Sequence, residues 1–358
     1  GSPWDLELPH RMRPSPSLPR SKAPRMRKLV LASVCTLMAT FASREASAAD
    51  CDNPIANPCI DLETSMPTGH DNVFANIPRV DIDKDAYGSV RIWNSYTRNS
   101  LLTSTPGGGG PGTNLSPSVG SRATTSLGGS VFAWNRLALD VVLPISWYQD
   151  GGGAALVGGS PLPTSSIGDL RLGLTGMIHR TRDIRGLDFE DGIALGVRGG
   201  LHLPTATAAG FAGSTSPVGV LSSTLSLRKG RWLGSFMLGA RIREASDYLD
   251  LRVGSQLEAG AGFGVEVLGE RKLVLGAELH ALLGLYGLRD VAVSKDGYVA
   301  LAGSRVHLPT EWAFIARTVP WKDLSFTATF GTSIPWSDST ALGSPAYRAT
   351  LSIGETFR

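Results

Sequence analysis

The stretch LALDVVLPISWYQ, Leu137 to Gln149, decides the fold of this chain. Its side chains alternate with a period of two, which is the period of a β-strand with two different environments. One face carries Asp140, Pro144, Ser146 and Tyr148. The other face is continuously apolar and consists of Leu137, Leu139, Val141, Leu143, Ile145 and Trp147. We therefore expect a long strand with one face in an apolar medium.

The same alternation recurs along the chain, for example in Leu273 to Tyr286. The predicted strands are as long as a tilted membrane strand of roughly 9 to 11 residues, and longer than the usual soluble strand of about 5 to 6. We predict about twelve strands, with ten or fourteen as the alternatives. The twelve cover residues 86–97, 122–134, 137–149, 167–180, 191–203, 217–228, 231–243, 253–267, 273–286, 304–318, 324–334 and 345–357.

The connections between these strands distinguish two fold classes. Tight turns such as Asn135-Arg136 and Lys229-Gly230 alternate with longer loops such as 98–121 and 287–303. Short periplasmic turns, long external loops and an even strand count are typical of bacterial outer-membrane barrels. We predict an all-β, transmembrane, antiparallel up-and-down β-barrel over residues 86–358. The alternative is a soluble β-sandwich with tryptophans in its core.

The aromatic residues favour the barrel. They gather near the ends of the predicted strands, as expected for two aromatic girdles about one hydrocarbon thickness apart. The tryptophans assigned to these girdles are Trp134, Trp147, Trp232, Trp312, Trp321 and Trp336.

The N-terminal part has a different organisation. Residues 1–25 read as an untranslated upstream segment, and residues 26–48 as a signal peptide with an apolar core from Leu29 to Ser43 and an A-x-A cleavage site. Residues 49–85 lack strand periodicity and are predicted to form a periplasmic N-terminal extension. These features predict export to the outer membrane of a Gram-negative cell.

Charge and cysteine usage agree with export. Without residues 1–48, the formal net charge changes from +3 to −2, with 26 basic and 28 acidic residues. The basic balance is therefore no reason to expect a nucleic-acid partner. In the oxidising periplasm we expect Cys51 and Cys59 to form a disulfide, with two free thiols as the alternative.

Charged residues of both signs lie opposite the apolar faces and are predicted to line the lumen. Structural filling of the lumen by mutual pairing is one interpretation, and a charge-selective pore is the other. The histidines His179, His202, His280 and His307 share this parity, but without local ligand spacing we expect no metal site and no cofactor. The lumen-lining candidates are Arg91, Asp140, Asp169, Arg171, Arg198, Arg241, Arg243, Glu258, Glu266, Glu278, Arg305, Glu311, Arg317 and Arg348.

Several segments carry a family resemblance. Trp134 to Gln149, Ile167 to Leu174 and Gly196 to Thr205 resemble the barrel portion of outer-membrane-protein-A-type proteins, without a peptidoglycan-binding domain. They are also similar to putative outer-membrane barrels of phenol-degradation pathways. These motifs mark barrel hairpins and no particular chemistry.

The sequence thus predicts a non-enzymatic barrel that acts as a passive channel or structural barrel for small solutes. A transporter for hydrophobic or aromatic compounds is the first alternative, suggested by the phenol-pathway resemblance, and an outer-membrane hydrolase is the second. Expected partners are outer-membrane lipid, the barrel-assembly machinery and small solutes.

Overall fold

The structure is a computed structural model. No helix in its described part is long and apolar enough to cross a membrane. It describes residues 51, 57–65, 67–69, 73–78, 80, 87–134 except 105–114, 136–182 except 158–159, 192–207, 210–248, 251–269, 272–285, 288–294, 297–305, 308–321, 323–334 and 345–357.

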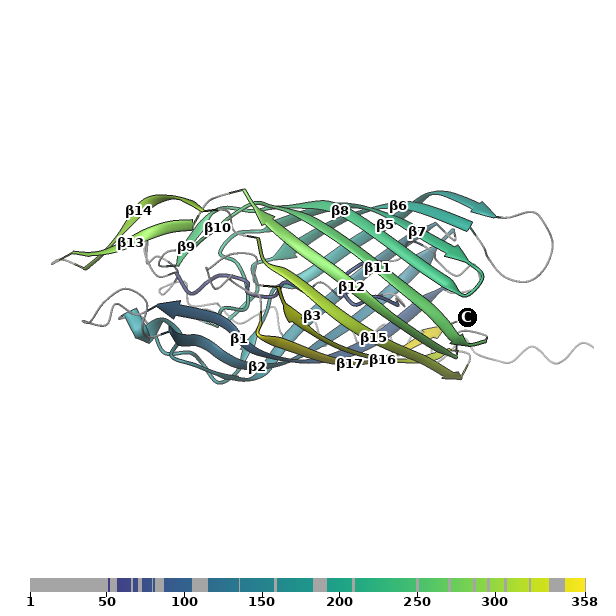
Figure 1. The fold of residues 1–358 in the computed structure, drawn as a ribbon, viewed down its shortest axis with the longest axis horizontal. Coiled ribbons are helices and arrows are strands. Elements are labelled where there is room, and N and C mark those ends of the chain that lie inside the picture. Colours follow the sequence, from purple (N-terminus) through teal and green to yellow (C-terminus); the bar gives the residue numbers. More distant parts are fainter. Residues whose placement is uncertain are drawn as a thin grey trace, which may run out of the picture. The chain divides into compact units, whose positions relative to one another are not determined.

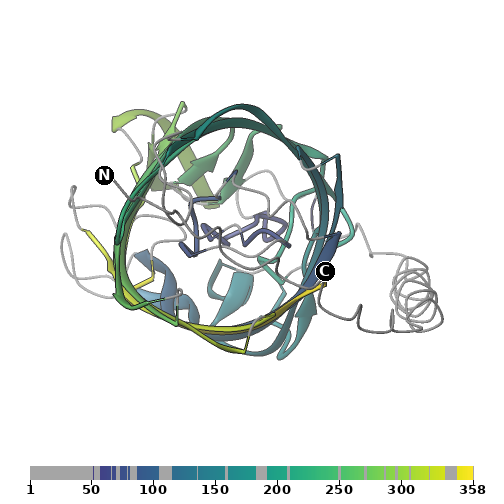
Figure 2. The same ribbon diagram turned by 90° about the vertical axis from the view of Figure 1, so that its right-hand side faces the viewer.

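A single closed sheet of twelve antiparallel strands forms the barrel. Each strand pairs with the next one in the series, and the last strand pairs with the first (Figures 1 and 2). Closure leaves no sheet edge to face lipid, where an unpaired backbone group would cost several kcal/mol. The strands are β1 (Gly88–Ser104), β2 (Leu115–Ala133), β3 (Leu137–Asp150), β5 (Leu170–Arg182), β6 (Gly192–Leu203), β7 (Val218–Lys229), β8 (Trp232–Ile242), β11 (Gln256–Leu268), β12 (Leu273–Gly284), β15 (Thr310–Trp321), β16 (Leu324–Ser333) and β17 (Tyr347–Phe357).

The long connections contain short strands (Figure 1). These connections lie at one end of the barrel, called here the long-loop end. The hairpin of β13 (Leu288–Ser294) and β14 (Gly297–Arg305) is a separate two-stranded sheet. The predicted strand 304–318 was therefore wrong at its start, because the barrel strand β15 begins only at Thr310. The others are β4 (Ser166–Ile167), which pairs with β3, and the hairpin of β9 (Ser246–Tyr248) and β10 (Leu251–Val253).

The exposure of the side chains is inverted relative to a water-soluble protein. On the outer face, Leu238 and Leu351 are 68% and 64% exposed, whereas Asp140 and Ser235 on the inner face are completely buried. The outer face is therefore suited to hydrocarbon. This inversion excludes the soluble sandwich.

Aromatic side chains lie near both rims. Trp134, Trp232 and Trp321 are exposed beside the short turns, and Trp147 is exposed near the long-loop end. Trp312 packs edge-to-face on Phe314, with ring centroids 5.0 Å apart. Trp336 lies outside the described residues.

The sequence predicted that the N-terminal region lies outside the barrel. The structure places it inside. The described residues between 57 and 80, called here the lumen segment, run inside the ring of strands (Figure 2). Ile60, Leu62, Phe74, Ile77 and Val80 of this segment are at most 3% exposed. The prediction of a periplasmic extension did not foresee this position, because it did not consider that these apolar side chains are buried against the inner wall.

The path of the lumen segment follows from its contacts. At the long-loop end, the Asn57 amide donates to the Asp247 carbonyl (3.0 Å) and Pro58 accepts from the Phe211 amide (3.2 Å). Further along, the carbonyl of Gly69 accepts from Ser89 Oγ (2.8 Å), at the beginning of β1. The segment thus enters at the long-loop end and reaches the short-turn end, where β1 begins.

Cys51 and Cys59 are joined by a disulfide, with their Cα atoms 5.5 Å apart. Cys59 is buried, and its amide donates to the Asn57 side chain (2.8 Å). The disulfide therefore lies at the long-loop end, where the lumen segment starts.

Candidate functional site: the occupied lumen

The inner wall carries most of the predicted charged residues, because alternate residues of each strand point inward. Eleven of the fourteen lumen candidates are buried, and Arg198 and Arg243 are partly buried. The buried ones are Arg91, Asp140, Asp169, Arg171, Arg241, Glu258, Glu266, Glu278, Glu311, Arg317 and Arg348.

Some of the expected positions were wrong. Arg305 belongs to β14 in the loop hairpin and not to the barrel sheet. His179 is exposed, because the register shift after Met177 pairs it with the outward-facing Leu195. Tyr148 is exposed for the same kind of reason, since the register shifts at Trp147. A one-residue bulge inverts the facing of every residue beyond it.

An ion-pair cluster binds the first part of the lumen segment to the wall near the long-loop end. Arg348 on β17 pairs with Glu63 of the segment and with Glu311 on β15, whose Oε2 lies 3.1 Å from its Nε. Thr64 Oγ1 accepts from Arg348 Nη2 (2.8 Å) and donates to Glu311. The buried guanidinium is therefore satisfied jointly by the wall and the segment.

Two further arginines hold the same part of the segment. Arg171 on β5 forms an ion pair with Asp61 at 3.2 Å and also donates to the Ser65 carbonyl. Arg241 on β8 donates to the Thr64 carbonyl (3.1 Å) while it pairs with the wall residue Glu258 at 3.0 Å. Carboxylates of the segment thus meet a basic zone of the wall.

Other ion pairs join two residues of the wall. Arg198 pairs with Asp140 at 2.6 Å, and Arg228 pairs with Glu266 at 2.9 Å. His280 Nε2 lies 2.8 Å from Glu258 Oε1. His280 and Glu258 lie on adjacent strands, whereas the pairs Arg198–Asp140 and Arg228–Glu266 each reach across one intervening strand.

Deeper in the lumen, the contact between segment and wall is apolar. Val73, Phe74 and Ile77 of the segment form one buried cluster with four wall residues. Burial of a side chain such as Phe74 contributes roughly 1.5 to 3 kcal/mol. The wall residues are Leu233 and Met237 on β8, Val274 on β12 and Ile315 on β15.

Glycines of the wall make room for the segment. A Cβ atom at Gly262 would lie 2.7 Å from two ring carbons of Phe74, and one at Gly196 would lie 2.5 Å from a methyl carbon of Val80. Such distances are sterically excluded, so no larger residue fits there while the segment is in place. Wall and segment are complementary in shape.

At the long-loop end, the lumen segment packs against the loops between the barrel strands. Ile60 and Leu62 pack with Phe211 and Tyr248, whose rings meet edge-to-face with centroids 5.0 Å apart. Arg122 donates to the carbonyls of Gly210 (2.7 Å) and Phe211 (3.0 Å). The loop after β6 is therefore held inward over the barrel mouth.

Asp169, just before β5, holds the same loop. Its carboxyl group accepts from the amides of Thr205 and Ala206 (both 3.2 Å) and of Ser214 (2.8 Å). Burial, together with the nearby Asp61 carboxylate, raises the pKa of Asp169 to about 7, although the backbone donors oppose this shift.

The sequence analysis missed the apolar part of the wall and the whole of the segment. Val274 has the same parity as Glu278 and His280, so the parity rule could have identified it. For the segment, the available signal was the group of large apolar residues between 60 and 80, which need burial in any folded state.

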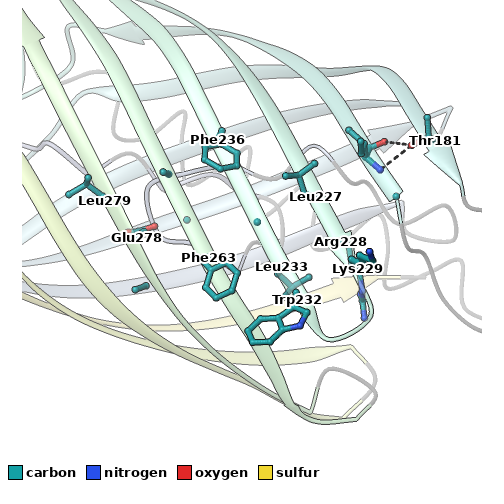
Figure 3. A pocket seen from close by; sticks show the side chains of 16 residues that line it. Thr181, Leu227, Arg228, Lys229, Trp232, Leu233, Phe236, Phe263, Glu278 and Leu279 are labelled. Atoms are coloured by element: carbon teal, nitrogen blue, oxygen red, sulfur yellow. Dashed lines mark hydrogen bonds between the residues drawn. The ribbon is translucent and has the colours of Figure 1, made fainter.

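The outer wall carries a lipid-facing groove of about 920 Å³ over β7, β8, β11 and β12 (Figure 3). Trp232, Phe236, Phe263 and Leu279 line the groove, and so does Gly234, which has no side chain. The groove lies on the outside of the wall that Phe74 contacts from within.

Together, the closed twelve-strand sheet, the apolar exterior and the charged interior define an outer-membrane β-barrel fold. No protein-family model matches the sequence, and no curated protein sequence matches it either. The solved COG4313 outer membrane channel from Pseudomonas putida F1 matches with a TM-score of 0.53 and 14% identity, covering 79% of this chain and 100% of that chain. At this identity the match shows the fold alone.

Two further barrels are more distant. The NanC porin has a TM-score of 0.41 and 9% identity, over 75% of this chain and 99% of its own. The Pseudomonas putida toluene transporter TodX has a TM-score of 0.35 and 9% identity, over 84% and 96%. These scores carry no argument about function.

Proposed function

We propose that the protein is a passive outer-membrane channel for small solutes, which the lumen segment holds closed. The observation that carries the proposal is that the lumen segment fills a polar barrel lumen, while its described residues form no strand pairing with the wall. The strands are fixed by continuous ladders, whereas the described side-chain contacts of the segment can dissociate individually. Passage therefore requires movement of the segment.

The charge of the wall predicts the selectivity of the open state. On the described barrel strands, eight arginines are buried or ion-paired, against five carboxylates. Asp61 and Glu63 of the lumen segment compensate part of this excess, so their departure leaves a positive wall. Rings of basic side chains favour anions. The arginines are Arg91, Arg122, Arg171, Arg198, Arg228, Arg241, Arg317 and Arg348, and the carboxylates are Asp140, Glu258, Glu266, Glu278 and Glu311.

Planar-bilayer recording of the refolded protein tests this function. The wild-type protein is compared with the double variant Asp61→Asn, Glu63→Gln, which weakens the attachment of the segment without changing any strand. We expect a higher open probability in the variant, and a reversal potential in a KCl gradient that indicates anion preference. If neither protein conducts, the channel function is wrong.

A transporter for aromatic compounds is the second candidate. The apolar cluster around Phe74 supports it, because a pore for ions or sugars needs no such patch. The similarity of Trp134–Gln149 to barrels of the outer-membrane-protein-A type and of phenol-degradation pathways is a hypothesis from sequence. Among the described residues we find no observation that favours a hydrolase, and we do not propose one.

The cellular location belongs to the same proposal. Residues 26–48 act as a signal peptide, and the mature chain begins near Ala49 and inserts through the barrel-assembly machinery. Outer-membrane fractionation, together with faster migration of unboiled than of boiled protein on a gel, tests this. Recovery from the soluble periplasm would contradict it.

A further inference from the structure

Outward-facing positions near the start of β8 alternate between large side chains and none. Trp232 and Phe236 are 53% and 50% exposed on the outer face, and Gly234 lies between them (Figure 3). A Cβ atom at Gly234 would lie 3.6 Å from its nearest neighbour, the Cβ atom of Leu227, which is ordinary van der Waals contact. The space over Gly234 is therefore open to the membrane and is not filled by a neighbouring side chain.

This space continues onto the neighbouring strands as the outer groove of about 920 Å³. Gly234 is paired with Phe263 on β11, and Phe263 is paired in turn with Ala277 on β12. The Phe263 ring stacks on the ring of Trp232, with centroids 5.3 Å apart. Aromatic rings thus stand beside small residues, a shape that suits one flexible hydrocarbon chain.

The length of the groove matches one leaflet of a membrane. Strand residues rise about 3.3 Å each, so the stretch from Trp232 to Phe236 is roughly 13 Å long. Half of a hydrocarbon core of about 30 Å is roughly 15 Å. Trp232 directly follows the short turn between β7 and β8, and tryptophans mark the membrane–water interface. The groove therefore extends from the interface on the short-turn side towards the midplane.

Two basic side chains lie at the interfacial end of the groove. Lys229 lines the groove and is paired with Trp232, and Arg231 precedes Trp232 in the turn. Both basic side chains are exposed. Arg228 pairs inward with Glu266 at 2.9 Å, whereas Lys229 and Arg231 form no ion pair with any described residue. These two cations are therefore accessible to an anionic group at the interface.

We propose that the groove is a binding site for an anionic phospholipid from the membrane leaflet on the short-turn side. One acyl chain fills the groove between the rings of Trp232, Phe236 and Phe263. The phosphate of the headgroup lies between Lys229 and Arg231. The site belongs to the outer wall, so it does not rest on the proposed channel function.

Two physical effects favour a bound lipid over the exchanging lipids around the rest of the wall. A groove that stays empty leaves its lining without partners for dispersion contacts, and an acyl chain supplies them. Basic side chains at the interface attract anionic headgroups. A zwitterionic headgroup such as phosphocholine gains less, because its own cation is repelled by Lys229 and Arg231. The site should therefore select lipids by the charge of the headgroup.

A second copy of the chain is a poorer occupant of the groove. In a two-fold dimer, the same surface patch of both copies forms the interface. Lys229 and Arg231 of both copies would then meet at one depth of the membrane, and like charges opposed across an interface are unfavourable. The charge at the end of the groove thus favours lipid over self-association.

Native mass spectrometry of the refolded mature chain tests the site. The protein is released from nanodiscs that contain equal amounts of phosphatidylglycerol, which is anionic, and phosphatidylcholine, with identical acyl chains. We expect the barrel to retain phosphatidylglycerol several-fold more often than phosphatidylcholine. Equal retention of the two lipids overturns the proposal.

Two variants with matched controls locate the bound lipid. Gly234→Leu fills the groove and should reduce the retained phosphatidylglycerol several-fold. Gly199→Leu is its control, because Gly199 is an exposed glycine on β6 with open space around its Cβ position. Lys229→Gln should lower the preference for phosphatidylglycerol several-fold. Its control is Arg136→Gln, which changes an exposed arginine in another short turn and should leave the preference unchanged.

The matched pairs decide the proposal. Equal effects of Gly234→Leu and Gly199→Leu, or of Lys229→Gln and Arg136→Gln, overturn it. The folding of every variant is checked by the gel shift between unboiled and boiled protein, and the comparison at Lys229 decides alone if Gly234→Leu does not fold. Dimers that are released from the wild type and absent from Gly234→Leu would assign the groove to a second copy and overturn the lipid site.

Discussion

Glu63 of the lumen segment and Arg348 on β17 form an ion pair, although 285 residues separate them in the sequence. The pair connects the first described part of the chain with its last strand. The strand is fixed in the sheet and the segment is not. This ion pair therefore contributes to the stability with which the segment is bound inside the barrel.

We expect Glu63→Gln to loosen the lumen segment without affecting the barrel. Removing one partner of a buried ion pair costs about 3 to 5 kcal/mol, and less here because Arg348 keeps Glu311. Open probability in single-channel recordings should rise. Glu355→Gln, an exposed change on the same strand, is the control, and equal recordings from both variants would contradict the seating role.

Adjacent positions on β3 test the facing of the strands. Asp140 is completely buried and pairs with Arg198, whereas Val141 lies on the outer face. Val141→Arg should cost roughly 2 to 4 kcal/mol near the midplane and impair folding into bilayers. Asp140→Asn should still fold into bilayers and act through ion selectivity or by unpairing Arg198. The opposite result in a gel-shift folding assay would mean that inner and outer faces are exchanged.

The disulfide should restrain the segment and not the barrel. Cys51→Ser, Cys59→Ser leaves every strand intact, so we expect normal assembly and faster maleimide modification of Thr68→Cys, which places a thiol at a buried position of the lumen segment. In the mature wild-type protein, which lacks Cys35 of the signal peptide, a thiol titration under denaturing, non-reducing conditions should find no free cysteine. Stoichiometric labelling there would exclude the bridge.

The start of the mature chain should be accessible from outside the cell. The disulfide lies at the long-loop end, and long loops of outer-membrane barrels face the exterior. An epitope tag placed before Cys51 should therefore bind antibody on intact cells. A tag in the short turn at Gly230 serves as the periplasmic control, and exclusive labelling after permeabilisation would contradict the described path of the segment.

Asp169 makes the loop after β6 sensitive to pH. Its pKa of about 7 in the folded state exceeds its ordinary value of 3.8, so the folded state binds the proton more tightly. Its contribution to stability is therefore full below about pH 4 and is lost as the pH rises through 7. Amide hydrogen exchange of residues 205–214, corrected for the intrinsic effect of pH, should show loosening from pH 6 to 8. Asp169→Asn should abolish this dependence, and an unchanged profile would refute the assignment.

The strands of the barrel could be predicted because period-two alternation is a local property of the sequence. The facing of Asp140 and Glu278 follows from parity alone. Bulges break this rule at Trp147 and Ile178, where no residue type indicates the register shift. The position of the lumen segment depends on contacts between residues hundreds of positions apart, such as Asn76 with Glu278, and no local pattern encodes them.

The path of the lumen segment also fixes an order of events during biogenesis. The seam between β1 and β17 joins the first and last strands of the barrel, and the segment precedes β1 inside the ring that this seam closes. Threading a disulfide-closed loop through a lumen lined with paired side chains would require those pairs to open. We therefore expect the sheet to close around the segment. The interior is then already packed when β17 pairs with β1.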